Sequence, residues 1–245
     1  MEKDLKISRR QFLTNTSFLS VGVITSLPIL DGFMQYDLKK NIEKKLKFEK
    51  IKIVGVGGGG NNTVNNLIDF NLKGVQFVAV NTDFKSLETC KAPIKLFIGE
   101  KITKGKSANG NPLIGRGAAF QSVGIIKKTF IGSHMVFITA GLGGGAGTGA
   151  VPVIAKICKD IGAQVIAIVT TPFSFEGEKR NKQADEGLLA LKKIVDTIVV
   201  RPNDRIRERV VKDDTISYMF KKADEDIYHF IKNIIEKPET ISSPT

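Results

Sequence analysis

The stretch GLGGGAGTGA, residues 141–150, joins two segments of different character. The apolar run HMVFITA (134–140) before it is typical of a buried strand, and VPVIAKICK (151–159) after it is typical of a helix. Each glycine in a helix or strand costs roughly 1 kcal/mol relative to alanine, so this density needs a compensating use. A tight turn would need only one or two glycines. Because the amino end of a helix presents unpaired N–H groups, and glycine lets a ligand approach the bare backbone, we expect this junction to bind phosphate.

A second glycine run lies earlier in the chain in the same context. IKIVGV (51–56) is a short continuous apolar run, as expected of a buried parallel strand, and it leads directly into GGGGNNTVNNLIDF (57–70). Further strands are expected at 75–80, 94–99, 133–140, 163–173 and 197–204, and helices at 113–130, 179–194 and 215–235. This alternation predicts an α/β fold in which helices cover both faces of a parallel sheet.

Both glycine loops fall at the carboxyl ends of predicted strands, where parallel sheets bind their ligands. Gly55, Gly57 and Gly60 satisfy G-x-G-x-x-G after a strand, and Asp83 follows about where a dinucleotide-binding fold places its ribose-binding acid. Such a fold has no use for a second, richer glycine loop, and the sequence offers no hydride-transfer constellation. Neither glycine run continues into G-K-[ST], which excludes a P-loop. Two loops favour a polyphosphate held from two sides by backbone N–H groups.

The composition is that of a globular protein with a basic surface. Of the 245 residues 42% are hydrophobic, and the formal charge is +12. The basic residues are dispersed and often lie beside acids, so we expect a solvated lysine-rich surface and no nucleic-acid partner. The two cysteines, Cys90 and Cys158, have no C-x-x-C partner, which indicates a reducing compartment and no zinc site. With two histidines far apart in sequence, we expect neither a histidine-based metal site nor a catalytic histidine cluster.

The first fifty residues differ from the rest. SRRQFL (8–13), followed by the moderately apolar stretch 14–30, resembles a bacterial twin-arginine export signal. No A-x-A cleavage site follows, and the apolar stretch is too polar for a transmembrane span. Residues 37–50 form a charged, helix-favouring linker. Residues 8–30 therefore leave export or membrane association as an alternative, whereas the chain downstream is typical of a cytoplasmic nucleotide-dependent protein.

Several motifs resemble one known family. GGGAGTG (143–149) is similar to the tubulin/FtsZ signature GGGTG[ST]G. The further segments that resemble bacterial members of this family, in the same order, are KIVGVGGGGNNTVNNLI (52–68), VAVNTD (78–83), GNPLIGRGAA (110–119), FITAGLGGGAGTGAVPVIAKICKDIGA (137–163), TPFSFEGEKR (171–180) and RPNDRI (201–206). The resemblance covers about residues 52–235.

The resemblance implies a fold, a domain division and a ligand. It implies a three-layer Rossmann-like parallel sheet of the tubulin/FtsZ GTPase type. The GTP-binding domain would occupy residues 51–237, after an N-terminal targeting-like segment with its charged linker at 1–50 and before a short tail at 238–245. The implied cofactors are GTP or GDP with Mg²⁺.

It also implies the residues that hold the nucleotide. They are Gly58, Gly59, Gly60, Asn61, Asn62, Gly144, Gly145, Gly147, Thr148, Gly149, Glu176, Arg180, Asn203 and Asp224. Asn62 would lie near the base, and the Thr148 hydroxyl would donate to phosphate at the start of the helix. Glu176 would accept from a sugar hydroxyl while Arg180 balances phosphate charge. The alternative for these two residues is an ordinary exposed i,i+4 ion pair.

Asp224, in KKADED (221–226), would read the base. A carboxylate accepts two hydrogen bonds, which suits the adjacent N–H donors of guanine and not adenine. Because the alignment of this acidic cluster with the family motif can shift by one residue, Glu225 is the alternative candidate for the residue that reads the base. The alternative is that the three acids 224–226 are the solvated face of a helix.

The sequence departs from the family pattern in three places. The family hydrolyses the nucleotide of one subunit with a loop N-x-D-x-x-D from the next, whereas here EKPETISSPT (236–245) follows the last helix, and the second family domain is absent. Hydrolysis by this chain alone should therefore be severely impaired. Lys106, in GKSANGNP (105–112), is placed to add positive charge near the γ-phosphate. Ala146 replaces a threonine of the signature, so one hydroxyl donor is missing.

Two hypotheses remain. In the first, the chain is a GTP-binding cell-division protein of the FtsZ type, cytoplasmic and at the division site, which needs a complete subunit to complete its active site or caps a filament end. In the second, it is a polymerisation-incompetent regulator or remnant that its N-terminal segment targets to or across a membrane. Nucleotide binding is expected in the first and optional in the second.

Overall fold

The computed structural model describes residues 50–207 and 216–236. The export-like segment 8–30, nearly all of the charged linker and the tail 238–245 lie outside these residues, so the expectations for them stay predictions.

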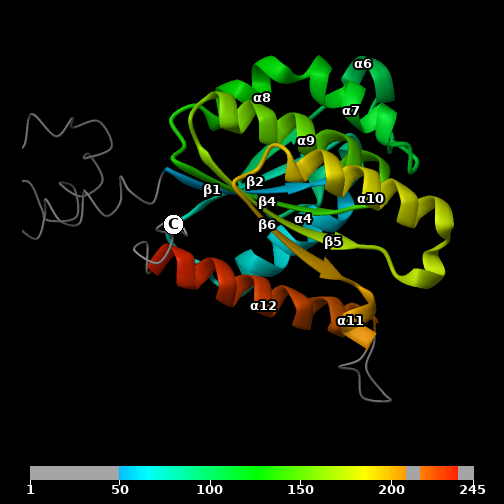
Figure 1. The fold of residues 1–245 in the computed structure, drawn as a ribbon. Coiled ribbons are helices and arrows are strands. Elements are labelled where there is room, and N and C mark those ends of the chain that lie inside the picture. The colour runs from blue at the N-terminus through cyan, green and yellow to red at the C-terminus, as the bar shows by residue number, and fades with distance from the viewer. Residues whose placement is uncertain (1–49, 208–215, 237–245) are drawn as a thin grey trace, which may run out of the picture. The chain divides into compact units, whose positions relative to one another are not determined.

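A six-stranded sheet forms the middle layer (Figure 1). Its strands are β1 (Ile51–Val56), β2 (Gln76–Asn81), β3 (Ile94–Phe97), β4 (Met135–Gly141), β5 (Gln164–Thr171) and β6 (Thr197–Pro202). All neighbouring pairs are parallel, in the order β3-β2-β1-β4-β5-β6. β1 lies at the centre, where Gly55 pairs with Ala79 on one side and Thr139 on the other. The predicted α/β fold with a parallel sheet is confirmed.

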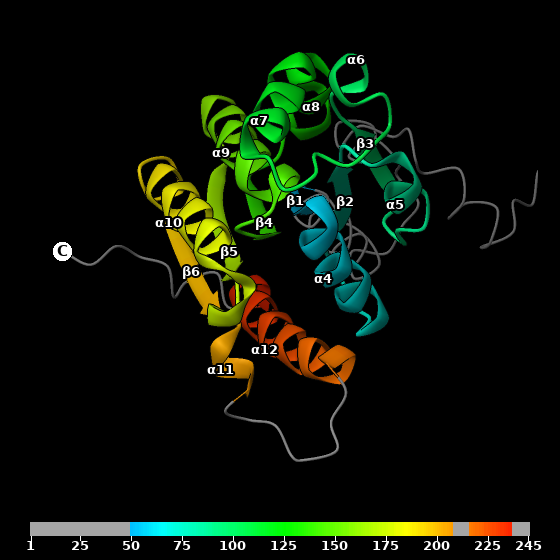
Figure 2. The ribbon, with the colours of Figure 1, turned by 90° about the vertical axis from the view of Figure 1, so that its right-hand side faces the viewer.

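Helices cover both faces of the sheet (Figures 1 and 2). They are α4 (Gly57–Asp69), α5 (Phe84–Glu88), α6 (Glu100–Thr103), α7 (Pro112–Gln121), α8 (Val123–Phe130), α9 (Gly145–Asp160), α10 (Glu178–Lys192), α11 (Asp204–Arg207) and α12 (Ile216–Glu236), with a short 3₁₀ turn η2 (Ser174–Glu176). Side chains of α7, α8, α9 and α10 form one hydrophobic core with the sheet. Side chains of α4, α5 and α12 form a second core on the opposite face.

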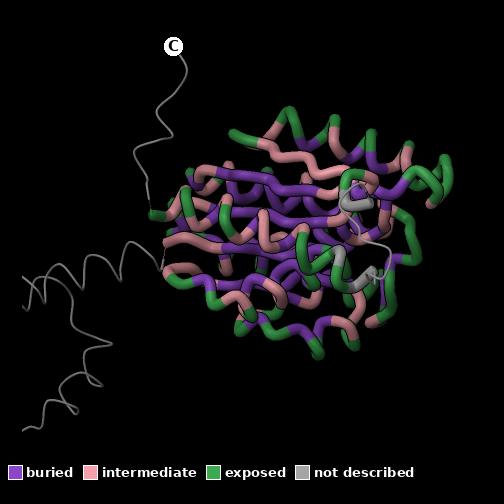
Figure 3. The backbone as a smooth tube through the Cα atoms, turned by 90° about the horizontal axis from the view of Figure 1, so that it is seen from below, coloured by how far each residue is buried: buried purple, intermediate pink, exposed green. Residues whose placement is uncertain are grey.

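The strands are apolar at successive positions because both of their faces are covered. Neighbouring residues point into different cores: Ile53 faces α4 and α12, whereas Val54 faces the α9 side, and all atoms of both side chains are buried. Figure 3 shows the buried residues concentrated along the central strands and the exposed residues at the outer helical turns and loops. Burial of each such side chain contributes about 1.5–3 kcal/mol, so the sheet is the stable frame on which the loops are placed.

One expected element differs. The apolar periodicity at 113–130 predicted a single helix, but the structure has α7 and α8, which meet at Ser122. Ser122 leaves the helical conformation, with φ −106° and ψ 15°. Its Oγ accepts a hydrogen bond from the Gly99 N–H at 3.0 Å, so a contact distant in sequence favours the break.

The final described helix, α12, is amphipathic. Ile227 and Ile231 are buried against the sheet, while Lys221 and Lys222 face solvent. Across residues 50–207 and 216–236, we find no helix with both the length and the apolar character that a membrane span requires.

Candidate functional site

The two glycine loops lie side by side at the point where the strand order reverses. From β1 the chain continues to β2 on one side, and from β4 it continues to β5 on the other. The loops that leave the carboxyl ends of these adjacent central strands therefore separate and leave a crevice, which is the usual ligand position in open α/β sheets. The first glycine run follows β1, and GLGGGAGTGA begins at the end of β4.

A pocket of about 350 Å³ lies between these loops. Half of the residues that line it are glycines. The lining residues are Val56, Gly57, Gly58, Gly59, Asn81, Asp83, Ser86, Ser107, Gly110, Gly141, Leu142, Gly144, Gly145, Ala146, Gly147 and Arg180. Asp83 and Arg180 are the charged side chains of this lining. Of the predicted site residues, the pocket thus brings together Gly58, Gly59, Gly144, Gly145, Gly147 and Arg180.

Helix amino termini face this pocket from both loops. α4 begins at Gly57 and α9 at Gly145, and neither has a side-chain cap or an acidic residue in its first turn. Their first N–H groups and the positive ends of both helix dipoles are therefore directed at the pocket without a competing carboxylate. This arrangement favours an anion that spans both loops.

The glycines serve two different purposes. A Cβ on Gly58 would meet nothing within 4 Å, so this position is open toward the pocket. A Cβ on Gly60 would lie 2.2 Å from the Thr139 oxygen, and one on Gly149 would lie 1.9 Å from the Pro112 oxygen. Gly60 and Gly149 therefore allow α4 to pack on β4 and α9 on α7, and neither lines the pocket.

Thr148 also lies outside the pocket lining. Its hydroxyl is buried and accepts a hydrogen bond from the Gly143 N–H at 2.8 Å. The side chain thus braces the glycine loop from behind, a role that the sequence motif did not indicate. Lys106 is exposed and does not line the pocket, whereas its neighbour Ser107 does.

The end of strand β2 contributes a polar turn, of which the sequence analysis considered only Asp83, as the ribose-binding acid of the dinucleotide-binding fold that it set aside. Asn81 Oδ1 accepts from the N–H groups of Thr82 and Asp83, at 2.8 and 3.2 Å. Asp83 Oδ1 in turn caps α5 by accepting from the Ser86 N–H at 3.0 Å. Asn81, Asp83 and Ser86 all line the pocket. The available signal was the motif VAVNTD, in which polar residues directly follow a buried strand.

Glu176 and Arg180 are joined at the rim. They form an i,i+4 ion pair, and Glu176 Oε1 also accepts from the Phe173 N–H at 2.8 Å. Arg180 lines the pocket and Glu176 does not. The ion pair that was considered as an alternative is therefore present, and it holds the Arg180 side chain at the edge of the pocket.

Asp224 is buried between α12 and α4, with 6% of its surface exposed. Thr63 Oγ1 donates to its Oδ1 at 2.9 Å, and Asn66 Nδ2 donates to its Oδ2 at 2.6 Å. Burial raises the pKa of Asp224 above its ordinary value, while these two hydrogen bonds and the charge of Arg201 act in the opposite direction. Glu225, the substitute candidate, instead pairs with Lys222 at 3.1 Å. Asp224 is thus the acid that faces the helix carrying the first glycine loop.

Two predicted asparagines are buried with unsatisfied polar atoms. Within the described residues, Asn61 Nδ2 and Oδ1 and Asn203 Oδ1 have no hydrogen-bond partner. Buried polar atoms are nearly always paired, so these atoms are candidates for contacts with a ligand. Asn62, by contrast, is exposed.

An aromatic residue near Asp224 was not predicted. Phe220 lies one helical turn before Asp224, is 37% exposed, and packs edge-to-face on Phe173 with ring centroids 6.0 Å apart. No sequence signal distinguished it from the other phenylalanines.

The fold and pocket define an α/β domain with a pocket suited to a phosphate-bearing ligand between two glycine loops at the centre of a parallel sheet. Comparison with known proteins gives the family. Residues 50–210 match the family model "Tubulin/FtsZ family, GTPase domain", and the chain belongs to this family.

Solved structures agree with this assignment. An FtsZ dimer without ligand from M. jannaschii matches with 44% identity and a TM-score of 0.75, over 84% of this chain and 59% of that chain. A W319Y mutant of M. jannaschii FtsZ matches with 44% identity and a TM-score of 0.72, over 82% of this chain and 60% of that one. The GTPγS-bound protofilament of CetZ2 from Haloferax volcanii shares the fold, with 22% identity and a TM-score of 0.70, over 79% of this chain and 60% of that chain. The chain thus spans about three-fifths of the length of these proteins.

Proposed function

We propose that the chain binds GTP and GDP in the pocket between its two glycine loops and acts as an FtsZ-type cell-division GTPase at the division site. The observation that carries this proposal is the convergence of two uncapped helix amino termini, α4 and α9, on one glycine-lined pocket. A single phosphate would occupy one such terminus, whereas a diphosphate or triphosphate can occupy both. The family assignment supports the same ligand class.

The phosphates would be held mainly by backbone. Gly58, Gly59 and residues 144–147 line the pocket and would offer their N–H groups, and Arg180 supplies the cation of its wall. Arg180 would balance phosphate charge while its ion pair with Glu176 keeps it oriented. Such a site recognises charge and shape, so we expect GTP and GDP to bind with comparable affinity.

The pocket also fits Mg²⁺ bound together with phosphate. Mg²⁺ usually keeps several waters and takes one or two carboxylates with phosphate oxygens. Asp83 is the carboxylate that lines the pocket, and its Oδ1 is already oriented by the Ser86 N–H at 3.0 Å. We propose that Asp83 holds the ion, which would neutralise phosphate charge when bound.

The base would be read by Asp224. Thr63 and Asn66 each use one lone pair of its two oxygens, which leaves further lone pairs to accept from the adjacent N–H donors of guanine. Phe220, one turn away and partly exposed, is placed to stack on the base. We propose that the unsatisfied oxygen of Asn203 and the carboxylate of Glu176 contact the ribose.

Hydrolysis would depend on another subunit. The 245 residues contain no N-x-D-x-x-D sequence, so a polypeptide of these residues lacks the acids that position water in the family. We propose that it assembles with complete FtsZ-type subunits in a filament or at a capped end. The alternative, a targeted regulator that does not polymerise, rests on residues 8–30.

The decisive experiment measures nucleotide binding by the purified chain. GTP and GDP should bind and ATP should bind at least tenfold more weakly, because one to two hydrogen bonds to a buried carboxylate are at stake. Asp224→Asn should reduce the preference for GTP, whereas the matched control Glu225→Gln should keep it. Lowering the pH should weaken GTP binding, because a protonated Asp224 accepts fewer hydrogen bonds. Since burial raises the pKa of Asp224, the weakening should begin at a higher pH than it would for an ordinary carboxyl group.

The possible outcomes separate the hypotheses. Absence of GTP and GDP binding would eliminate the GTPase proposal and leave the regulator. Equal binding of GTP and ATP would keep a phosphate site and remove Asp224 as base reader.

A further inference from the structure

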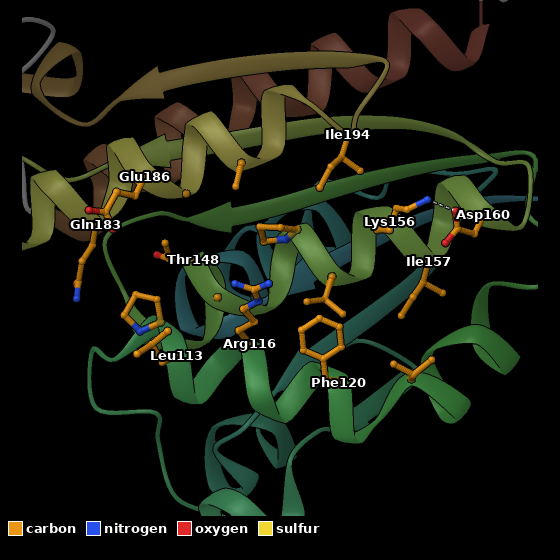
Figure 4. Close-up of a pocket in the computed structure, with 17 residues that line it drawn as sticks. Leu113, Arg116, Phe120, Thr148, Lys156, Ile157, Asp160, Gln183, Glu186 and Ile194 are labelled. Carbon is orange, nitrogen blue, oxygen red and sulfur yellow. Dashed lines mark hydrogen bonds and ion pairs between the residues drawn. The ribbon is translucent and has the colours of Figure 1, made fainter.

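A groove between α7, α9 and α10 lies behind the glycine loop that follows β4 (Figure 4). Its volume is about 520 Å³, and much of its wall is apolar, with Phe120, Val153, Ile157 and Ile194. The groove is distinct from the nucleotide pocket, and the two share no lining residue. At one end of it lie two polar side chains, Thr148 on α9 and Gln183 on α10.

These two side chains hold Gly143 by both of its backbone groups. Thr148 Oγ1 accepts from the Gly143 N–H at 2.8 Å. When the Gln183 amide is turned so that its nitrogen faces Gly143 and Gly110, the nitrogen donates to the Gly143 oxygen at 3.1 Å and to the Gly110 oxygen at 3.2 Å. This orientation of the Gln183 amide is required because only the nitrogen can donate to the two carbonyl oxygens that face it.

Gly143 and Gly110 belong to the two segments that close the nucleotide pocket. Leu142 and Gly144, on either side of Gly143, line the pocket, and Gly110 lines it directly. Both glycines have positive φ angles, 91° at Gly143 and 71° at Gly110. One Gln183 amide therefore joins the loop after β4 to the segment 105–111, which precedes α7.

We propose that Gln183 is a positioning residue that ties these two loops together and thereby slows nucleotide release. The proposal rests on the proposed nucleotide binding. Gln183 does not line the nucleotide pocket and acts through the backbone of Gly143 and Gly110. When the tie is intact, both loops keep the separation that a polyphosphate between them requires. Loss of the tie frees each loop to move away from the other.

The test removes the two hydrogen bonds that Gln183 donates while keeping the side chain at about the same size. Gln183→Met keeps the length and the neutral charge but has no donor. Gln183→Lys keeps a long chain with donors that can reach both carbonyl oxygens. Glu186→Gln is the matched control, because Glu186 lines the same groove on α10 and has no hydrogen bond to either loop among the residues that the structure describes.

Two readouts are measured on the full 245-residue chain. The first is the dissociation rate of fluorescently labelled GDP, followed after addition of excess unlabelled GDP. The second is amide hydrogen exchange of segments 105–111 and 141–146 in the nucleotide-free protein. Gln183→Met should release GDP about tenfold faster and speed exchange in both segments, with circular dichroism unchanged. Gln183→Lys should stay within about threefold of the unmutated chain, and Glu186→Gln should match it.

Two results would overturn the proposal: exchange and release unchanged in Gln183→Met, or equal acceleration in Gln183→Met and Gln183→Lys, which would show that the donors do not matter. Failure of the unmutated chain to bind GDP would instead contradict the proposed function. The exchange measurement would still decide whether Gln183 ties the loops.

Discussion

Asp224 illustrates how a residue can be singled out from sequence while its surroundings stay unknown. The motif KKADED indicated an acid that accepts from guanine, but the choice between Asp224 and Glu225 depended on which face of the helix meets α4. The structure places Asp224 against Thr63 and Asn66, at 2.9 and 2.6 Å, and Glu225 beside Lys222. These contacts join residues about 160 positions apart in the chain, and no periodicity within α12 encodes them.

Thr148 shows the opposite case. The glycine-rich motif drew attention to its hydroxyl as a phosphate donor, whereas that hydroxyl accepts from the Gly143 N–H and is turned away from the pocket. A side chain in the first turn of a helix can point to the ligand or back to its own loop, and sequence spacing does not distinguish the two.

Ala146 provides a test at this scale, because it lines the pocket where the family signature has threonine. Ala146→Thr adds a hydroxyl beside the phosphates, and a hydrogen bond of about 1 kcal/mol should tighten GDP binding about fivefold. Equilibrium titration with labelled GDP measures the change. Ala146→Val, which has the same shape and no hydroxyl, is the control and should bind no tighter than the unmutated chain. Equal affinities for all three proteins would mean that backbone N–H groups alone determine binding.

At the scale of elements, the positions of the strands could be predicted because a buried strand is recognisable from the apolar residues of its own short segment. Most contain a continuous apolar run, although Lys95 interrupts β3, and all six appear within a few residues of the expected positions. The break between α7 and α8 was missed because it depends on the bond between Ser122 and Gly99. The short helices α5 and α6 were also not anticipated, since four or five residues carry too little periodicity.

The start of α4 allows a test of ligand contact against helix packing. Gly58→Ala places a methyl group in open space, so the fold should be retained while GDP binding weakens about tenfold through loss of close backbone approach. Gly60→Ala places a methyl group 2.2 Å from the Thr139 oxygen, so it should lower the free energy of unfolding by about 1–3 kcal/mol. Urea unfolding and GDP titration of both variants separate the two effects. Unaltered stability in Gly60→Ala would show that α4 and β4 are not packed as described.

At the scale of the whole molecule, the strand order alone does not identify the ligand. The order β3-β2-β1-β4-β5-β6 is also that of dinucleotide-binding folds, so the same sheet supports either ligand class. The second glycine loop after β4 makes the difference, because it closes the crevice with a second helix amino terminus. This reasoning was available from the sequence, whereas the separation of the pocket from the α7–α9–α10 groove was not.

Measuring phosphate release tests whether hydrolysis of GTP by the chain depends on a second subunit. The purified chain of 245 residues with GTP should release phosphate at least about a hundredfold more slowly than an FtsZ-type protein that contains the N-x-D-x-x-D sequence, since these residues do not include it. Adding a complete protein that cannot bind GTP itself should accelerate release from the chain. The same protein with its N-x-D-x-x-D loop neutralised should not. Rapid release by the chain alone would contradict the proposed need for a second subunit.

Helix α4 also fixes the distance between the two ends of the proposed nucleotide site. Its first turn faces the phosphate pocket, and Thr63 and Asn66 further along it hold the proposed base reader. At a rise of about 1.5 Å per residue, Gly58 and Asn66 lie about 12 Å apart along the helix axis. Inserting one residue between Gly58 and Thr63 would lengthen this part of the helix by about 1.5 Å. It would also rotate Thr63 and Asn66 by about 100° around the helix axis, away from Asp224. The helical phase of α4 thus sets both the distance and the direction from the glycine loop to the proposed base reader.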